Sequence, residues 1–244
     1  MFERIQWKTV FITGASAGID EATAVLFAKY GSNLILTTRR ENLHDKLKQD
    51  ILSQYPTIKE AFRNLPEWAA QIDILVNNAG LALGALPLMS IPESSIDTMI
   101  NTNVKGLIFV TQQALPKMIQ RNSGHIINVG SALGYNAIPT GSVYSATKFA
   151  VRALTDSLRI ETNATKIKVS EVCPGIVKTD FNRVKFFDKK DAEDNFYKGL
   201  ETATAEDLAE VIVFTASTHP RCVISNITAV PIRQANPYII HREC

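Results

Sequence analysis

The 244-residue sequence has little cysteine, no marked excess of charge and no long apolar run. Its three cysteines stand far apart and form no CxxC pair, which argues against a disulfide framework and a zinc site. A formal net charge of +2 without a basic cluster argues against binding to nucleic acid. No run resembles a signal peptide or a membrane span, so we expect a cytoplasmic protein that binds no membrane.

Short β-branched runs alternate with longer helical patterns, and no linker or repeat divides the chain. The short runs are apolar on both faces, as buried parallel strands are. We therefore predict an α/β fold: one domain over residues 1–244, with a doubly wound, mostly parallel, Rossmann-like sheet. The expected strands are Thr9–Thr13, Asn33–Thr38, Ile72–Val76, His125–Val129, Lys168–Val172 and Val223–Val230. The expected helices are Glu21–Tyr30, Ser94–Gln120, Ser142–Asn163 and Ala205–Ala216, the last with Thr204 as its N-cap.

One pair of residues indicates acid–base chemistry. Tyr144 and Lys148 are four residues apart on an expected helix, so they share a face, and Ser131 stands thirteen residues before the tyrosine. A nearby ammonium should lower the pKa of the phenol, which ordinarily lies near 10, by about 1–3 units. Tyr144 could then exchange a proton with a substrate oxygen near neutral pH. The alternative is an ordinary pair on a helix surface.

A glycine-bearing turn, Thr13-Gly-Ala-Ser-Ala-Gly-Ile19, joins the first expected strand to the first expected helix. Glycines at this place let backbone N–H groups approach a pyrophosphate at the positive end of the helix. A tight structural turn explains the same pattern, and only its position after the very first strand favours phosphate binding.

With these motifs in order, the chain resembles the short-chain dehydrogenase/reductase family along nearly its whole length. Spacing alone is weak evidence, because Tyr55 and Lys59 repeat it beside Pro56 and without a matching serine. The ordered set is specific. It comprises the glycine turn, Asn77-Asn78-Ala79-Gly80, Asn103-Val104, Ser131, Tyr144-x-x-x-Lys148 and Pro174-Gly175.

The resemblance implies a role for each motif. It makes Tyr144 the acid–base residue and counts both Tyr144 and Lys148 among the residues that bind the cofactor, with Lys148 at the nicotinamide ribose. It has Ser131 orient the substrate oxygen and Asn103 help to hold a proton-relay water. It also implies a dimer or tetramer, formed through the helices at Ser94–Gln120 and Ser142–Asn163. The remaining residues expected to bind the cofactor are Gly14, Ser16, Gly18, Ile19, Asn78, Ala79, Gly80, Pro174, Gly175, Val177 and Thr179.

The end of the second strand indicates which cofactor is used. The family's NAD enzymes usually carry an acid there for the ribose 2′-hydroxyl, whereas arginine suits a 2′-phosphate. This chain has Thr38, Arg39 and Arg40, which favour NADP. The alternative is a pair of solvated arginines at the start of a helix.

The chain departs from the family pattern in two places. Asp20 replaces the third glycine of the turn and adds bulk and negative charge near the expected pyrophosphate. Between Arg40 and Asp73 no third strand is recognisable, and something on the order of fifteen residues is missing. We therefore expect the third, edge strand of the sheet to be absent or reduced.

We expect an NADP-dependent dehydrogenase that acts on a small hydroxy acid or carbonyl compound. The chain most resembles enzymes that oxidise 3-hydroxy acids such as serine and allo-threonine, in segments that include the Gln234-Ala-Asn-Pro tail. Arg183, Lys185 or Arg233 could pair with the substrate carboxylate; solvated charges are the alternative. Two other hypotheses are a cofactor-impaired, non-catalytic protein that acts through oligomer contacts and a general carbonyl reductase.

Overall fold

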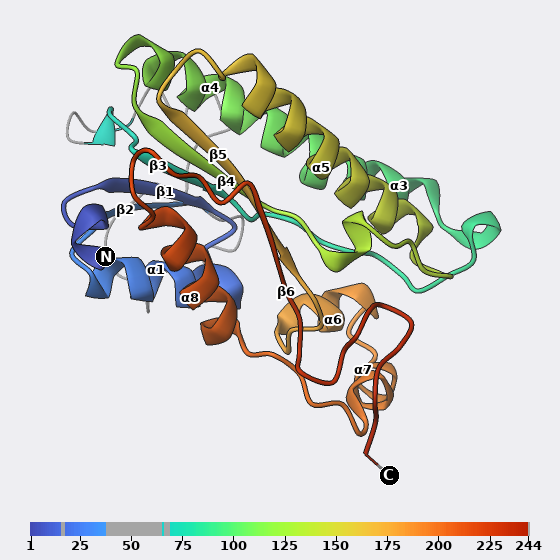
Figure 1. Ribbon diagram of the computed structural model, residues 1–244. Helices are drawn as coiled ribbons and strands as arrows, with labels where there is room; N and C mark the ends of the chain where they lie inside the picture. Colours follow the sequence, from blue (N-terminus) through green and yellow to red (C-terminus); the bar gives the residue numbers. More distant parts are fainter. Residues whose placement is uncertain (16–17, 38–64, 66–68, 244) are drawn as a thin grey trace.

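A computed structural model describes residues 1–15, 18–37, 65 and 69–243. Its centre is a six-stranded, wholly parallel sheet with the order β2-β1-β3-β4-β5-β6 (Figure 1). Parallel strands end at the same edge, so the loops that follow them gather there. The strands are β1 (Thr9–Thr13), β2 (Asn33–Thr37), β3 (Ile74–Asn77), β4 (Gly124–Val129), β5 (Ile167–Pro174) and β6 (Asn226–Ala229).

Helices cover both faces of the sheet (Figure 1). On one face α1 (Ile19–Lys29) packs against α8 (Ala205–Ala216). On the other lie α3 (Glu93–Ile100), α4 (Leu107–Gln120) and α5 (Ser142–Glu161). The shorter elements are the 3-10 turns η1 (Phe2–Ile5), η4 (Leu88–Ser90) and η6 (Ala132–Gly134), the π-helical turn η5 (Asn101–Gly106), and the helices α6 (Asp180–Lys185) and α7 (Lys190–Tyr197).

Strand β1 shows why the sheet is covered on both sides. Its five residues are all buried. Val10 and Ile12 face the α1–α8 layer, while Phe11 faces the layer that holds α4. This alternation follows from the two-residue period of a strand, so a strand whose central residues are all apolar requires apolar cover on both faces.

Most of the expected elements are present. The predicted bounds of the first strand and of the last helix match β1 and α8, and the N-cap at Thr204 is confirmed, since its side chain and that of Asp207 form a capping box. The expected helix Ser94–Gln120 is wrong as one regular helix, because a π-helical turn separates α3 from α4. Helices α6 and α7 were not predicted from the sequence.

The described part of the chain contains no strand beyond β2, which forms one edge of the sheet. The prediction of a lost third strand concerns residues 41–72, most of which lie outside the described residues, as do Tyr55 and Lys59.

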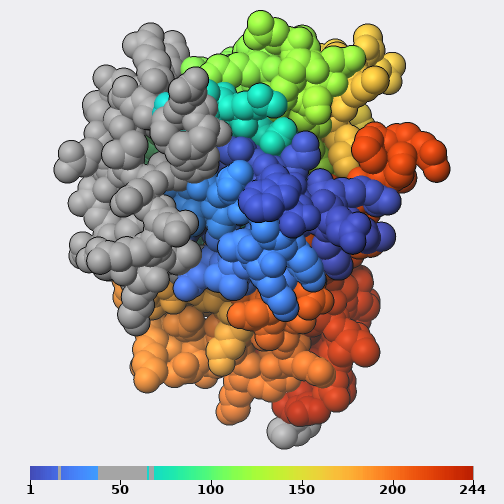
Figure 2. Space-filling view, turned by 90° about the vertical axis from the view of Figure 1, so that its left-hand side faces the viewer, coloured from blue at the N-terminus to red at the C-terminus, as the bar shows by residue number. Residues whose placement is uncertain are grey.

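The segment after β5 and the C-terminal segment meet beyond the carboxyl ends of the strands. Arg242 donates hydrogen bonds to the carbonyls of Phe196 and Lys198, and the N–H of Glu243 bonds to Gly199. Figure 2 shows the orange segment with α7 beside the red C-terminal residues, below the blue N-terminal elements. These two segments build one wall of the site.

Candidate active site

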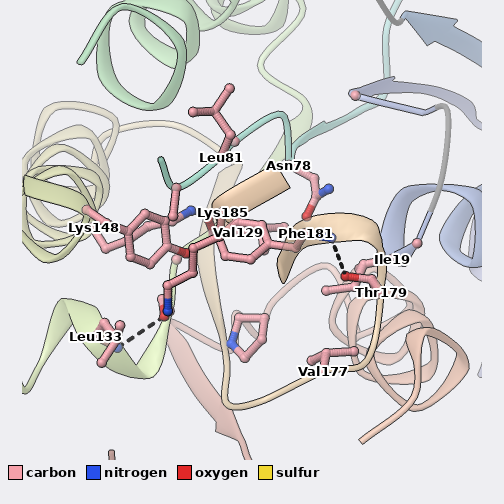
Figure 3. Close-up of a pocket in the computed structure, with 18 of the residues that line it drawn as sticks. Ile19, Asn78, Leu81, Val129, Leu133, Lys148, Val177, Thr179, Phe181 and Lys185 are labelled. Carbon is pink, nitrogen blue, oxygen red and sulfur yellow. Dashed lines mark hydrogen bonds between the residues drawn. The ribbon is translucent and has the colours of Figure 1, made fainter. Parts of the chain in front are cut away.

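A pocket of about 910 Å³ opens at the carboxyl ends of the strands (Figure 3). It extends from the glycine turn after β1 to the ends of β4 and β5, where α/β sheets of this kind bind ligands. The structure therefore brings together most of the residues predicted from the sequence. Lining this pocket are Gly14, Gly18, Ile19, Asn78, Ala79, Gly80, Ser131, Tyr144, Lys148, Pro174, Gly175, Val177 and Thr179.

Helix α5 carries Tyr144 and Lys148 on one face, as their spacing predicts. The Lys148 ammonium lies 5.7 Å from the centre of the Tyr144 ring. It donates a hydrogen bond of 2.8 Å to the carbonyl of Val129, at the end of β4. The side chain is 5% exposed, so the lysine is a buried cation fixed to the sheet.

Ser131 completes the group beside Tyr144. It caps η6, where its Oγ accepts a hydrogen bond of 3.1 Å from the N–H of Leu133, and its hydroxyl hydrogen-bonds to the Tyr144 phenol. The prediction that Lys148 lowers the pKa of this phenol below its ordinary value is wrong. Burial raises the pKa of Tyr144 and outweighs the lowering by the Ser131 hydrogen bond. The phenol is therefore protonated at neutral pH.

Burial acts on Lys148 in the opposite sense. Desolvation disfavours its charged form and lowers its pKa to about 8, although Cys173, Glu171 and Asp20 oppose this change. Even so, the ammonium is the predominant form at neutral pH.

Asn103 lies in the π-helical turn η5 and is buried. Its Oδ1 accepts from the N–H of Leu81 at 2.9 Å, and its Nδ2 donates to the carbonyl of Leu81 and the hydroxyl of Thr147 at 2.8 and 3.0 Å. The side chain thus ties the loop after β3 to α5 and does not line the pocket. A relay through Asn103 would use its main-chain carbonyl, because the amide is already bonded.

The backbone of the glycine turn after β1 lies close to neighbouring residues. Gly14 and Gly18 have φ values of 90° and 73°, which L side chains rarely adopt. A Cβ on Gly18 would lie 3.1 Å from the side chain of Thr179, so the turn touches the segment after β5. Ser16 lies outside the described residues, so its expected role cannot be placed in this turn.

Asp20 points into the same part of the pocket. It lies in the first turn of α1 and is 6% exposed. A Cβ on Gly14 would lie 2.9 Å from its Oδ2 and 3.0 Å from Cα of Ala79. The carboxylate therefore packs over the glycine turn, and its charge reaches Lys148, whose pKa it raises.

Buried polar contacts hold the strand ends beneath the pocket. The Thr13 hydroxyl accepts hydrogen bonds of 3.2 and 3.1 Å from the N–H groups of Asn78 and Ala79. The amide of Asn77 donates to Thr111 and Asn128 at 3.0 and 2.9 Å. Thr13 and Asn77 are positioning residues that the sequence did not single out, although both stand at strand ends inside the recognised motifs.

Gln234 supports the segment that follows β5. Its Oε1 accepts a hydrogen bond of 2.8 Å from the N–H of Ile176, and it packs against the Cα of Gly175, where a side chain would collide with it. The side chain is 4% exposed and lines the pocket. The sequence indicated this residue only as part of a resembling tail.

The arginines that indicate the cofactor cannot be placed. Thr38, Arg39 and Arg40 follow β2 outside the described residues. The last described residue of that strand, Thr37, does line the pocket. Within the described ranges, no cluster of three or more His, Cys, Asp or Glu is suited to a metal ion, and no helix has the length and apolar character needed to cross a bilayer.

Comparison with known proteins agrees with this geometry. The family model for short chain dehydrogenases matches residues 8–190, which is well over half of the chain. The chain belongs to the short-chain dehydrogenase family. An NADP-dependent 3-hydroxy acid dehydrogenase of Schizosaccharomyces pombe is 38% identical over 255 residues and is covered to 98%, as is this chain. Because this chain has only 244 residues, an alignment of that length includes gaps in it.

Two serine dehydrogenases are also similar. The serine 3-dehydrogenase of Rhizobium radiobacter is 35% identical, with 93% of this chain and 95% of the relative covered. A solved structure, the closed form of serine dehydrogenase complexed with NADP+, has a TM-score of 0.89 and 35% identity over 96% of this chain and 100% of the neighbour. The similarity thus extends over nearly the whole chain, and one of the similar structures contains a bound cofactor.

Proposed function

We propose that this short-chain dehydrogenase is an NADP-dependent oxidoreductase that interconverts a small 3-hydroxy acid and the corresponding 3-oxo acid. The observation that carries the proposal is the meeting of Ser131, Tyr144 and Lys148 in one pocket with the glycine turn. The names of the similar proteins, which specify NADP, 3-hydroxy acids and serine, support the choice of cofactor and substrate class.

The pocket fits a dinucleotide at most of the expected positions. Gly14 and Gly18 give the turn the positive φ values that L side chains rarely adopt, and Ile19 begins a helix whose N–H groups face the turn. In the proposal the adenosine side contacts Asn78, Ala79 and Gly80, and the nicotinamide side contacts the Pro174–Thr179 segment, including Gly175 and Val177. Thr38, Arg39 and Arg40 would receive the 2′-phosphate.

The chemistry that NADP+ would supply, held by the residues named above, is an acceptor for the hydride of the substrate's carbinol carbon. The residues of the chain handle the proton: Ser131 holds the substrate oxygen, and Tyr144 removes the hydroxyl proton as the C–H bond breaks. The Lys148 ammonium stabilises the phenolate form in which Tyr144 accepts this proton, a step that leaves Tyr144 as the neutral phenol. Asn103 contributes its main-chain carbonyl to proton exit. In the reverse direction the protonated Tyr144 donates its proton to the carbonyl oxygen, and burial of the phenol keeps that form populated.

The test measures binding before turnover. Purified protein is titrated with NADPH and NADH, and formation of NADPH is then followed with 3-hydroxypropionate and with L-serine. The proposal predicts that NADPH binds more tightly than NADH. It also predicts that one molecule of the 3-oxo acid forms for each molecule of NADPH. Absence of binding at millimolar cofactor would support the cofactor-impaired alternative, in which Asp20 opposes the pyrophosphate. Preference for neutral ketones and aldehydes would support a general carbonyl reductase.

We also propose a single-domain homodimer or homotetramer that works in the cytoplasm. Support for assembly comes from exposed apolar side chains on α4 and α5, which belong to the two segments expected to form the subunit interface. They are Phe109 and Ile119 on α4 and Phe149 and Ile160 on α5. Light scattering of the wild type and of a Phe109→Glu, Phe149→Glu variant checks the assembly, which should dissociate in the variant.

A further inference from the structure

Three cations were expected as possible partners of a substrate carboxylate: Arg183, Lys185 and Arg233. The structure shows that their surroundings differ. Arg183 pairs with Asp180 and Asp188 at 3.3 and 3.6 Å, and half of its side chain is exposed. Arg233 pairs with Glu201 at 2.9 Å and with Glu243. Neither arginine lines the pocket. Both charges are therefore neutralised outside the site.

Lys185 is placed differently. It ends α6 and lines the pocket, and it is labelled there in Figure 3. Among the described residues no carboxylate oxygen lies within 4.0 Å of its ammonium. The only other cation that lines the described part of the pocket is Lys148, which donates to the carbonyl of Val129 and which the proposed function assigns to the Tyr144 phenolate.

Aromatic rings hold the Lys185 ammonium in place. Its Nζ lies 5.2 Å from the ring centres of both Phe186 and Phe196, a distance at which a cation is attracted to the face of a ring. Burial lowers the pKa of Lys185 because the rings remove part of its water. A partly desolvated cation with no acidic partner gains most from an anionic ligand.

Helix α6 also relates the position of Lys185 to that of Tyr144, the proposed acid–base residue. Phe181 stands four residues earlier on α6, so the two side chains share a face. The Phe181 ring meets the Tyr144 ring edge-on at 5.5 Å between centres. One turn of α6 thus carries both the ring that contacts Tyr144 and the side chain of Lys185. The backbone of Lys185 is itself fixed, since its carbonyl accepts from the N–H of Gly84 at 2.9 Å.

We propose that Lys185 is the residue that selects acids: its ammonium binds the substrate carboxylate while Tyr144 and Ser131 hold the hydroxyl. This inference rests on the proposed function and assigns the substrate class to one side chain. It explains why a pocket with many apolar residues would prefer a hydroxy acid over a neutral alcohol, because a neutral substrate leaves the desolvated ammonium without a partner.

The test compares an acid with its neutral ester. We expect Lys185→Met to lower kcat/KM for 3-hydroxypropionate about 100-fold and to change kcat/KM for methyl 3-hydroxypropionate less than threefold, because about 2.7 kcal/mol corresponds to two decades. Methionine keeps a long unbranched side chain against the rings and removes only the charge. Lys185→Arg should retain most of the preference for the acid.

Two matched controls remove neighbouring charges. Arg183→Met and Arg233→Met should leave the acid-to-ester ratio within a factor of three of the wild type. An equal loss with acid and ester in Lys185→Met, or an unchanged ratio, would overturn the proposal. A large fall of the acid-to-ester ratio in Arg183→Met or Arg233→Met, in place of Lys185→Met, would also overturn it.

A binding measurement separates this proposal from the function on which it rests. Calorimetry of the NADPH complex with malonate, a three-carbon acid without a hydroxyl, should show at least tenfold weaker binding in Lys185→Met. The wild type could bind malonate through Lys185 and yet oxidise neither 3-hydroxypropionate nor its methyl ester. In that case the carboxylate site is confirmed and the proposed reaction is wrong. If malonate binds equally to both proteins or to neither, the role of Lys185 is refuted.

Discussion

The two halves of the pocket differ in how closely they follow the family pattern. Around β4 and α5 the serine, tyrosine and lysine meet as the motif predicts, and buried contacts to Val129 and Leu133 hold them. Around β1 and α1 the glycine turn has its left-handed glycines, yet Asp20 packs over it. Within one pocket, the half around β4 and α5 therefore keeps the family pattern, whereas the half around β1 and α1 departs from it at Asp20.

The two halves are coupled through charge. Asp20 is one of the groups that raise the pKa of Lys148 against the effect of burial. The carboxylate that should oppose a pyrophosphate therefore also favours the charged form of the lysine. Variants of each half can show how far this coupling extends.

The largest expected effect comes from removing the proposed acid–base group. Tyr144→Phe should lower kcat/KM by ~10²–10⁴ and leave the Kd for NADPH within threefold of the wild type. In the wild type, oxidation should become faster as pH rises, because burial raises the pKa of Tyr144 and oxidation needs the phenolate. Steady-state rates from pH 6 to pH 10, together with fluorescence titration of NADPH, check both points. A variant that loses cofactor binding along with activity would contradict the separation of the two halves.

Lys148 allows a test of stability against pH. Its pKa in the folded chain is about 8, below the ordinary value of 10.5, so between these values the unfolded chain holds a proton that the folded chain has released. The free energy of unfolding should therefore rise with pH across that window, by an amount on the order of 3 kcal/mol. Lys148→Met should lack this rise and be more stable at pH 7. Urea denaturation at several pH values measures the free energy of unfolding of both proteins. If this free energy depends on pH equally in both, burial of the Lys148 charge does not lower the stability.

A smaller effect is expected at Asp20. Asp20→Gly should bind NADP+ about 10- to 100-fold more tightly, since removing one negative charge near a pyrophosphate is worth roughly 1–3 kcal/mol. Asp20→Asn keeps the size of the side chain, so it separates charge from bulk. Calorimetric titration gives both Kd values. If the asparagine variant binds like the wild type while the glycine variant improves, bulk is the obstacle and the electrostatic explanation is wrong.

The sequence predicted some parts of this site better than others, for physical reasons. Tyr144, Lys148 and Ser131 could be placed because helix spacing and strand ends determine where such residues lie. The short helix α6 with Phe181 and Lys185 was not predicted, since a helix of six residues gives little periodic signal and depends on tertiary packing.

The direction of the pKa shift at Tyr144 also could not be read from the sequence. Spacing reveals that a lysine is near, but the amount of water removed from the phenol depends on the folded pocket. The Gln234 contact to Ile176 likewise joins residues that are 58 positions apart, and no local pattern predicts such a pair.

The central claim is that the proton-handling half is functional and that Asp20 limits only affinity for the cofactor. Single-turnover formation of NADPH from 3-hydroxypropionate, measured at pH 7 over a series of NADP+ concentrations, tests it most directly. The account predicts that wild type and Asp20→Gly reach the same saturating rate within threefold, and that the glycine variant reaches it at a lower NADP+ concentration. A saturating rate that is at least tenfold higher in Asp20→Gly, or no NADPH formed by either protein, would contradict the account.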